Sequence, residues 1–361
     1  MLPTMWRGPA IGVVMSTVLG CASVAGLDDY RQSVATGGGG AGGSPGQGGG
    51  PTSWPPPDEL FDDADLRPVI AVSATNAYVA EAETFAAGAQ NLSWILEIGL
   101  KGGSSQLVTV RDVVDHMALA AGGWLVWSSD LGNCAMGYDD LQAYNLVSGN
   151  EDDEGAMCQE TIGGLAAGGG RVVYARTDGV PPTTGRLFEW VEAASDAELV
   201  STVTVPVLGA VAVAGNSVYV VGGTGNDSRL YTINQIGELT EVVSEPVHTV
   251  TASGDGVSWA TRAGDVVSTV GNDFGSKVVH ADGFTNVHSI LRHGDHVYWS
   301  SPADGTIHRA PKSGVGSETL ASGQDQPTAL AIAEASNGVT YLYWVNVAPD
   351  LGGLMRLPLD P

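Results

Sequence analysis

The chain is poor in positive charge. Its 361 residues contain 15 Lys and Arg against 40 Asp and Glu, which gives a formal net charge of −25. Nucleic-acid binding relies on clustered cations that neutralise phosphates, so this composition argues against a nucleic-acid partner. The same charge disfavours docking of the protein surface on anionic lipid headgroups. An acidic, solvated surface is the simplest interpretation, and a preference for divalent cations is the alternative.

The sequence also lacks the motifs of common phosphate-dependent and zinc-dependent enzymes. It contains no P-loop and no HExxH segment. One GxSxG match, at 42–46, lies in a glycine-rich stretch without the strand and helix that a nucleophile elbow needs. Five of the seven histidines fall between 280 and 308, but strand alternation would place them on different faces and loops. The sequence therefore nominates no catalytic residue and no metal ligand.

The first 21 residues have the pattern of an export signal. One basic residue, Arg7, precedes an apolar run at 10–20 that is too short for a stable transmembrane span. The run ends in Val18-Leu19-Gly20-Cys21, which resembles a bacterial lipobox with Val and Leu in place of the usual Leu and small residue. The resemblance implies that Cys21 is acylated and becomes the mature N-terminus. A secretory signal cleaved near Ala25 is the alternative.

The residue after Cys21 indicates which membrane the lipoprotein would be anchored in. In Gram-negative lipoproteins an Asp at this position tends to retain the protein at the inner membrane, and Ala22 stands here. The resemblance therefore implies an outer-membrane or cell-surface lipoprotein. The sequence does not distinguish a periplasmic from an outward-facing position.

A glycine- and proline-rich stretch follows the export signal. Residues 37–57 read GGGGAGGSPGQGGGPTSWPPP. Such a composition cannot bury enough apolar surface to offset its ordering entropy, which predicts a disordered tether over residues 22–57. A flexible chain of about 36 residues has a root-mean-square reach of ~30–35 Å. Residues 58–361 are expected to form the folded domain.

An apolar triplet that contains an aromatic residue, or ends beside one, recurs through this domain. Its copies end every 39 to 48 residues, a period typical of propellers and solenoids. The seven copies end at Val79, Trp127, Tyr174, Val220, Trp259, Trp299 and Trp344. A short apolar segment and a turn precede each copy, which predicts a hairpin. A third and often a fourth apolar segment follow, as in a four-stranded propeller blade.

We therefore predict an all-β propeller of seven four-stranded blades, with six blades as the alternative. The units span about 68–110, 111–161, 162–206, 207–246, 247–281, 282–323 and 324–361. The last unit stops without a fourth strand, and an open edge invites aggregation. Residues 59–67, although poor strand formers, are the candidate for this missing strand. The aromatic residues expected in the blade cores are Trp127, Tyr174, Trp259, Trp299 and Trp344.

The two clearest copies, VYWSSPADGTIHRAPKSG and LYWVNVAPDLGGLMRLPL, resemble the YWTD and NHL class of propellers. In that class a Tyr-Trp strand is followed by a turn and an Arg-containing strand. The Thr-Asp of YWTD is replaced here by Ser300-Ser301 and Val345-Asn346, and the class usually has six blades. With the lipobox and the tether, the whole pattern resembles exported bacterial propeller lipoproteins.

Two cysteines remain once Cys21 is assigned to the lipid. Cys134 and Cys158 in an exported chain predict one disulfide, with two free thiols as the alternative. The disulfide would close an acidic insertion in the second unit. Several carboxylates in one loop could bind Ca²⁺ or form a recognition surface, although the spacing does not match an EF-hand. The acidic residues nominated for this role are Asp139, Asp140, Asp152, Asp153 and Glu154.

These features favour a binding or scaffold module displayed on a membrane through a lipid anchor. Its partner would be a protein or a glycan, and a catalytic role is not required by any motif. The alternatives are a lyase or hydrolase with its site at the central channel, and a purely structural envelope protein. A group of carboxylates and histidines at one channel mouth would favour the enzyme.

Overall fold

The structure is a computed structural model of the chain. It describes residues 54–63, 65–83, 92–101, 103–110, 113–130, 139–154, 160–178, 184–190, 198–203, 205, 207–234, 237–314, 316–347 and 352–359. The fold statements below concern these residues. Cys21, Cys134 and Cys158 lie outside them, so the lipid anchor and the disulfide stay predictions.

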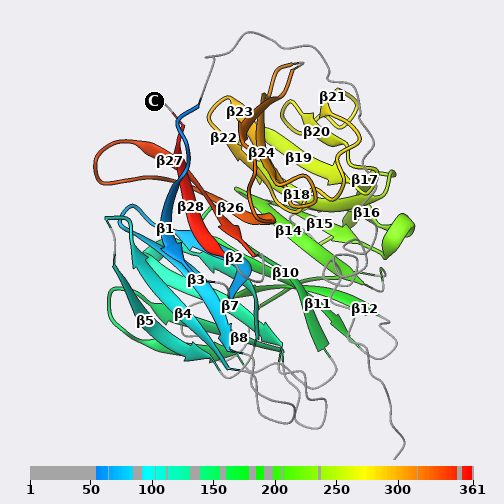
Figure 1. Cartoon of the computed structure of the whole chain (residues 1–361). Helices are drawn as coiled ribbons and strands as arrows, with labels where there is room; N and C mark the ends of the chain where they lie inside the picture. The colour runs from blue at the N-terminus through cyan, green and yellow to red at the C-terminus, as the bar shows by residue number, and fades with distance from the viewer. Residues whose placement is uncertain are drawn as a thin grey trace, which may run out of the picture. The chain divides into compact units, whose positions relative to one another are not determined.

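The described domain is an all-β propeller with seven four-stranded antiparallel blades, as the repeats predict (Figure 1). Blade 1 consists of β2 (Leu66–Val72), β3 (Asn76–Glu83), β4 (Leu92–Gly99) and β5 (Ser104–Val110). Blade 2 consists of β6 (Val113–Leu119), β7 (Trp124–Asp130), β8 (Asp139–Asn145) and β9 (Glu151–Glu154). Blade 3 consists of β10 (Glu160–Gly168), β11 (Arg171–Asp178), β12 (Thr184–Trp190) and β13 (Glu198–Val203).

The second half of the domain repeats this plan. Blade 4 consists of β14 (Leu208–Ala214), β15 (Ser217–Gly222), β16 (Arg229–Ile233) and β17 (Leu239–Val243). Blade 5 consists of β18 (Val247–Ser253), β19 (Gly256–Thr261), β20 (Val266–Thr269) and β21 (Lys277–Ala281). Blade 6 consists of β22 (Ile290–His293), β23 (His296–Ser301), β24 (Thr306–Pro311) and β25 (Glu318–Ala321). Blade 7 consists of β26 (Pro327–Glu334), β27 (Thr340–Asn346), β28 (Gly353–Pro358) and β1 (Asp58–Asp62).

The first strand of each blade is the innermost one. The strands β2, β6, β10, β14, β18, β22 and β26 contact one another in succession, and β26 contacts β2, so the ring is closed. The described helical elements are the single 3₁₀ turns η2 (Ala121–Gly123) and η3 (Gly225–Asp227). Within the part of the chain that the structure covers, no helix is long and apolar enough to cross a membrane.

The last blade borrows its outer strand from the N-terminal part of the domain. Strand β1 pairs antiparallel with β28, from Asp58 opposite Arg356 to Asp62 opposite Gly353. In Figure 1 the blue β1 lies along the red β28. The expectation that residues 59–67 supply this strand is confirmed, with a shift of its start to Asp58 and an end at Asp62. The remaining residues of that stretch lead into β2.

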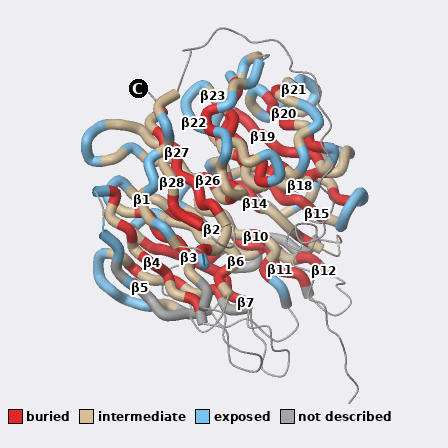
Figure 2. Tube along the Cα trace, viewed as in Figure 1, coloured by how far each residue is buried: buried red, intermediate tan, exposed pale blue. Residues whose placement is uncertain are grey.

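The cores lie between neighbouring blades, where each sheet face packs on the next. Buried segments accordingly follow the strands and exposed segments follow the turns (Figure 2). The five aromatic residues nominated for the cores are between 0% and 2% exposed: Trp127, Tyr174, Trp259, Trp299 and Trp344. Three of the indoles donate their N–H to polar side chains, as buried Trp usually does, whereas no described residue accepts from Trp299 Nε1. The acceptors are Gln142 at 3.0 Å, Glu245 at 3.2 Å and Gln324 at 3.1 Å.

The chain is fastened to the propeller before β1 begins. Trp54 packs against the core between blades 6 and 7, and the guanidinium of Arg309 lies 4.4 Å from its ring centroid. Such a cation–π contact contributes about 0.5–2 kcal/mol. Asp58, the first residue of β1, forms an ion pair of 3.4 Å with Arg356. Residues 54–62, which we call the latch, therefore join blade 7 to blade 6 through Trp54 and also pack against the core between blades 7 and 1 through Leu60 and Phe61.

Two truncations test the latch. Removal of residues 1–53 should leave the free energy of unfolding unchanged, because the latch is kept. Removal of residues 1–62 should lower it by roughly 2–4 kcal/mol, because Leu60 and Phe61 leave the core and β28 loses its partner. The second protein should also associate as its concentration rises, since β28 becomes an open edge. Urea denaturation and light scattering measure both effects, and equal stability of the two truncations would contradict closure by β1.

Candidate functional site

The two ends of the propeller differ in their connections. The innermost strands begin at one end, where the links between blades and between second and third strands also lie. We call this the loop end. The opposite end holds the tight turns within each blade and is called the hairpin end. The strand ends that flank Cys134 and Cys158, including Asp130, Asp139 and Glu154, all lie at the loop end.

The innermost strands are irregular where they begin. Six of them shift register against their partner within the first few residues, at β2, β6, β10, β14, β18 and β26. A bulge of this kind re-aims a side chain and recurs next to functional sites. The residues in or next to these irregular steps include Arg67, Asp115, His116 and His248. His288 lies just before β22, and its N–H donates to the Ser300 carbonyl at 3.1 Å.

These five residues, which we call the polar set, come from four blades. Arg67 belongs to blade 1, Asp115 and His116 to blade 2, His248 to blade 5 and His288 to blade 6. All five are half-buried. Among the described residues, no group of three or more His, Cys, Asp or Glu is placed to hold a metal ion. The polar set therefore consists of polar side chains of mixed charge, and Arg67, Asp115 and His248 already interact with other groups of the protein.

Two histidines of the polar set are poor bases. Burial lowers the pKa of His116 to about 4, although a hydrogen bond with the backbone of Ile162 opposes this change. Burial also lowers the pKa of His288 to about 4, with a further contribution from the positive charge of His248. The His288 Nδ1 atom is buried, and no described residue hydrogen-bonds it. Both imidazoles are therefore neutral at neutral pH.

The first strands of blades 3 and 4 carry glycine at their irregular steps, where blades 1, 2 and 5 carry members of the polar set. A Cβ atom on Gly163 would lie 1.9 Å from the Leu208 carbonyl oxygen. One on Gly164 would lie 2.4 Å from the Gly209 carbonyl oxygen. These glycines let the backbones of β10 and β14 approach closely. The polar set is therefore confined to the other blades.

The acidic residues of the second blade are placed differently from the single loop that we expected. Asp139 and Asp140 begin β8, and Asp152, Asp153 and Glu154 form most of β9, which pairs with β8. The side chains of four of them lie outside the described residues, Asp152 being the exception. Binding of Ca²⁺ therefore stays a prediction. The correction is that two paired strands, and not one open loop, carry these carboxylates.

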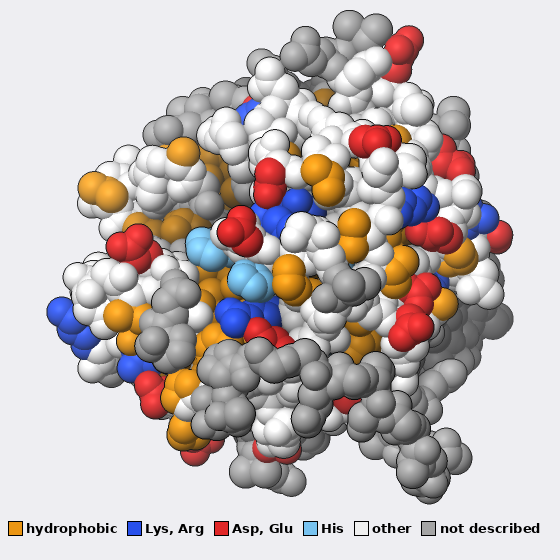
Figure 3. Space-filling view, turned by 90° about the horizontal axis from the view of Figure 1, so that it is seen from above, with side chains coloured by type: hydrophobic (Ala, Val, Ile, Leu, Met, Phe, Trp, Pro, Cys, Tyr) orange, Lys and Arg blue, Asp and Glu red, His pale blue; other side chains and the backbone are white. Residues whose placement is uncertain are grey.

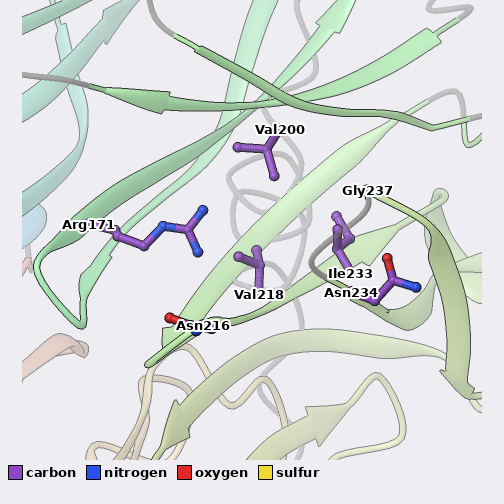
Figure 4. Close-up of a pocket in the computed structure, with 7 residues that line it drawn as sticks. All are labelled: Arg171, Val200, Asn216, Val218, Ile233, Asn234 and Gly237. Atoms are coloured by element: carbon purple, nitrogen blue, oxygen red, sulfur yellow. The ribbon is translucent and has the colours of Figure 1, made fainter.

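A small pocket lies at the hairpin end between blades 3 and 4 (Figure 4). Its volume is about 200 Å³, and its lining residues are Arg171, Val200, Asn216, Val218, Ile233, Asn234 and Gly237. Ligand pockets are usually larger, about 300–1,000 Å³. The one cation in this lining, Arg171, is paired with Glu189 at 2.7 Å. The pocket is therefore a weaker candidate than the loop end.

Figure 3 shows one face of the molecule on which acidic and basic side chains are interspersed with histidine and apolar groups. No single-sign patch dominates the described surface in this view. The sequence signals no role for the polar set, because its members come from four blades and the register shifts beside four of them are invisible in the residue pattern. The histidines at 280–308 are spread over β21, β22, β23, β24 and the link before β22, as strand alternation predicts.

The buried histidines predict an acid-sensitive stability. An unfolded His protonates near pH 6.5, whereas folded His116 and His288 stay neutral until about pH 4. Stability should therefore fall as the pH drops from about 6.5 towards 4, by up to roughly 3 kcal/mol for each histidine. Urea denaturation at pH 7, 6 and 5 measures the fall. The His116→Gln and His288→Gln variants should each show a shallower slope, and slopes equal to that of the wild type would contradict the assignment.

Comparison with known proteins supports the fold and nothing finer. No protein-family model matches the chain, and no curated protein matches it. A computationally designed protein, Ika8, has a similar structure, with a TM-score of 0.55 and 13% identity over 83% of this chain and 98% of that one. A chain of the nidogen/laminin complex gives a TM-score of 0.45 and 10% identity over 62% of this chain and 86% of that one. The similarity to the designed protein therefore concerns the fold alone, because the two sequences differ widely.

Proposed function

We propose that this protein is an exported, lipid-anchored binding module whose contact face is the loop end of the propeller. The observation that carries the proposal is where the chain joins the domain. Asp58 pairs with Arg356, near the hairpin end of β28, and Trp54 packs on Arg309 in the half of β24 nearer the hairpin end. The latch therefore approaches the ring from the hairpin end. An anchor at Cys21 would hold that end toward the membrane.

The loop end would then face away from the membrane. If residues 22–53 are flexible, their root-mean-square reach is ~30 Å, so the domain stays near the bilayer without lying on it. The net charge of −25 also repels the domain from anionic lipids. The described links at the loop end include 282–289, 302–305 and 322–326. Surface loops on a rigid scaffold are the usual carriers of recognition.

The polar set supports a protein or glycan as the partner. Neutral imidazoles, one guanidinium and one carboxylate together donate and accept hydrogen bonds, which suits hydroxyl and amide groups. A nucleic acid would need a clustered positive surface, and the composition opposes one. The partner would therefore be recognised by polar contacts at the loop end.

A second candidate is a lyase or hydrolase at the channel mouth. The presence of three histidines and Asp115 at the start of inner strands favours it, because imidazole and carboxylate are the usual acid–base groups. The low pKa of His116 and His288 makes them weak bases at neutral pH, which favours the binding module instead. If the wild type turns over any member of a panel of lactones and esters, the Asp115→Asn variant should lose that turnover.

A matched pair of photo-crosslinking positions tests the binding module. Ala303 is exposed at the loop end, in the β23–β24 link, and Ser336 is exposed at the hairpin end, in the β26–β27 turn. In intact cells the crosslinker at 303 should capture one partner in a constant ratio, and the crosslinker at 336 should not. Capture should be lost in Cys21→Ala, which also loses radiolabelled palmitate.

Two outcomes would contradict the proposal in different ways. Specific capture from position 336 alone would place the contact face at the hairpin end. Unchanged capture and unchanged membrane association in Cys21→Ala would remove the lipid anchor from the proposal while keeping the contact face.

A further inference from the structure

The contact between blades 5 and 6 contains a row of buried polar groups where other blades pack apolar side chains. The row runs from Arg292 in β22 through Ser258 in β19 and Ser268 in β20 to His280 in β21. The three distances along it are 2.7, 2.6 and 2.7 Å. These four residues are between 0% and 8% exposed. We call them the polar row.

The two ends of the polar row fix the direction of its hydrogen bonds. A guanidinium only donates, so Ser258 Oγ accepts from Arg292 Nη1. A carbonyl only accepts, so the contact of 3.3 Å between His280 Nδ1 and the Gly314 oxygen requires a proton on Nδ1. In neutral His280 the Nε2 atom then accepts from the Ser268 hydroxyl. The hydroxyl of Ser258 in turn donates to Ser268 Oγ, and every group in the row is satisfied.

A proton on His280 Nε2 breaks this order. Nε2 would then donate to Ser268, whose hydroxyl would have to turn toward Ser258. Ser258 Oγ already accepts from Arg292, and its own hydroxyl hydrogen would have no acceptor in the row. Leaving one buried donor unsatisfied is costly, and the added positive charge also faces Arg292. The hydrogen-bonding pattern of the polar row is therefore compatible only with a neutral His280.

The carboxylate nearest to Arg292 stays charged at neutral pH. Arg292 bonds Ser253 at 3.0 Å and lies 3.4 Å from Asp255, which also pairs with Lys312 at 2.6 Å. Partial burial raises the pKa of Asp255, but the bond from Lys312 and the neighbouring charges outweigh it and hold that pKa well below its ordinary value. Asp255 is therefore ionised from pH 5 upward. His280 is therefore the group of this network on which a response to mild acid would depend.

We propose that the polar row is an acid-sensitive fastener, and that protonation of His280 reversibly opens the contact between blades 5 and 6. Burial lowers the pKa of His280 below its ordinary value of 6.5, and the charge of Arg292 lowers it further, against the opposing bond to Gly314. Once the contact opens, the imidazole reaches solvent and regains its ordinary pKa. Opening is therefore favoured as the pH falls below about 6.5.

Hydrogen exchange on the full-length protein tests the fastener. Protection of amides in β20 and β22, corrected for intrinsic exchange, should fall by about tenfold or more between pH 7.5 and pH 5. In His280→Gln the fall should be smaller, because the Gln oxygen accepts from Ser268 and its N–H₂ donates toward Gly314 without titrating. The part that remains reflects the acid sensitivity linked to His116 and His288. His288→Gln is the matched control, since it removes a buried histidine outside the row. Its loss of protection in β20 and β22 should still exceed that of His280→Gln.

A second variant keeps the proposal testable if His280→Gln does not fold. Ser268→Ala removes the hydroxyl that stabilises neutral His280, so the pKa of His280 in the closed contact should rise toward that in the open one. The loss of protection between pH 7.5 and pH 5 should therefore be smaller than in the wild type. Equal wild-type protection at pH 7.5 and pH 5 would overturn the proposal. An equal loss in His280→Gln and in the wild type would overturn it as well.

Discussion

The fold depends on one constraint, which is that no blade has a core of its own. Each four-stranded sheet buries its two faces only against its neighbours, as the core clusters between blades show. Seven sheets therefore need a closed ring, because a gap would expose two apolar faces at once. Strand β1 completes this ring by pairing with β28. A nine-residue latch of Trp54 to Asp62 thus supports packing that extends around the whole domain.

The sequence predicts this architecture well because the constraint repeats. Each blade needs an aromatic or β-branched triplet on its second strand and a turn before it, so the requirement appears seven times along the chain. The closing strand is harder to find, since its residues Asp58, Glu59 and Asp62 are poor strand formers. Its pairing is determined by the unpaired edge of β28 and by Arg356, nearly 300 residues away.

The candidate sites were less accessible from the sequence for a related reason. Arg67, His116 and His248 stand in ordinary strand sequence, and only their position next to register shifts brings them to one end of the ring. The polar row likewise joins Ser258, Ser268 and His280 with Arg292 of the next blade. Single-sequence patterns report local periodicity, whereas these contacts join strands and blades.

The same constraint determines which contact between blades can open while the rest of the ring stays folded. At most blade contacts apolar side chains interlock, and their packing is indifferent to pH. At the contact between blades 5 and 6 the stabilisation depends partly on the direction of hydrogen bonds, which a single proton on His280 reverses. The contact between blades 6 and 7 is instead reinforced by Trp54 of the latch, whose ring lies against Arg309. Opening one contact therefore leaves the ring closed at the other six, and the domain can loosen in acid while β1 keeps its partner.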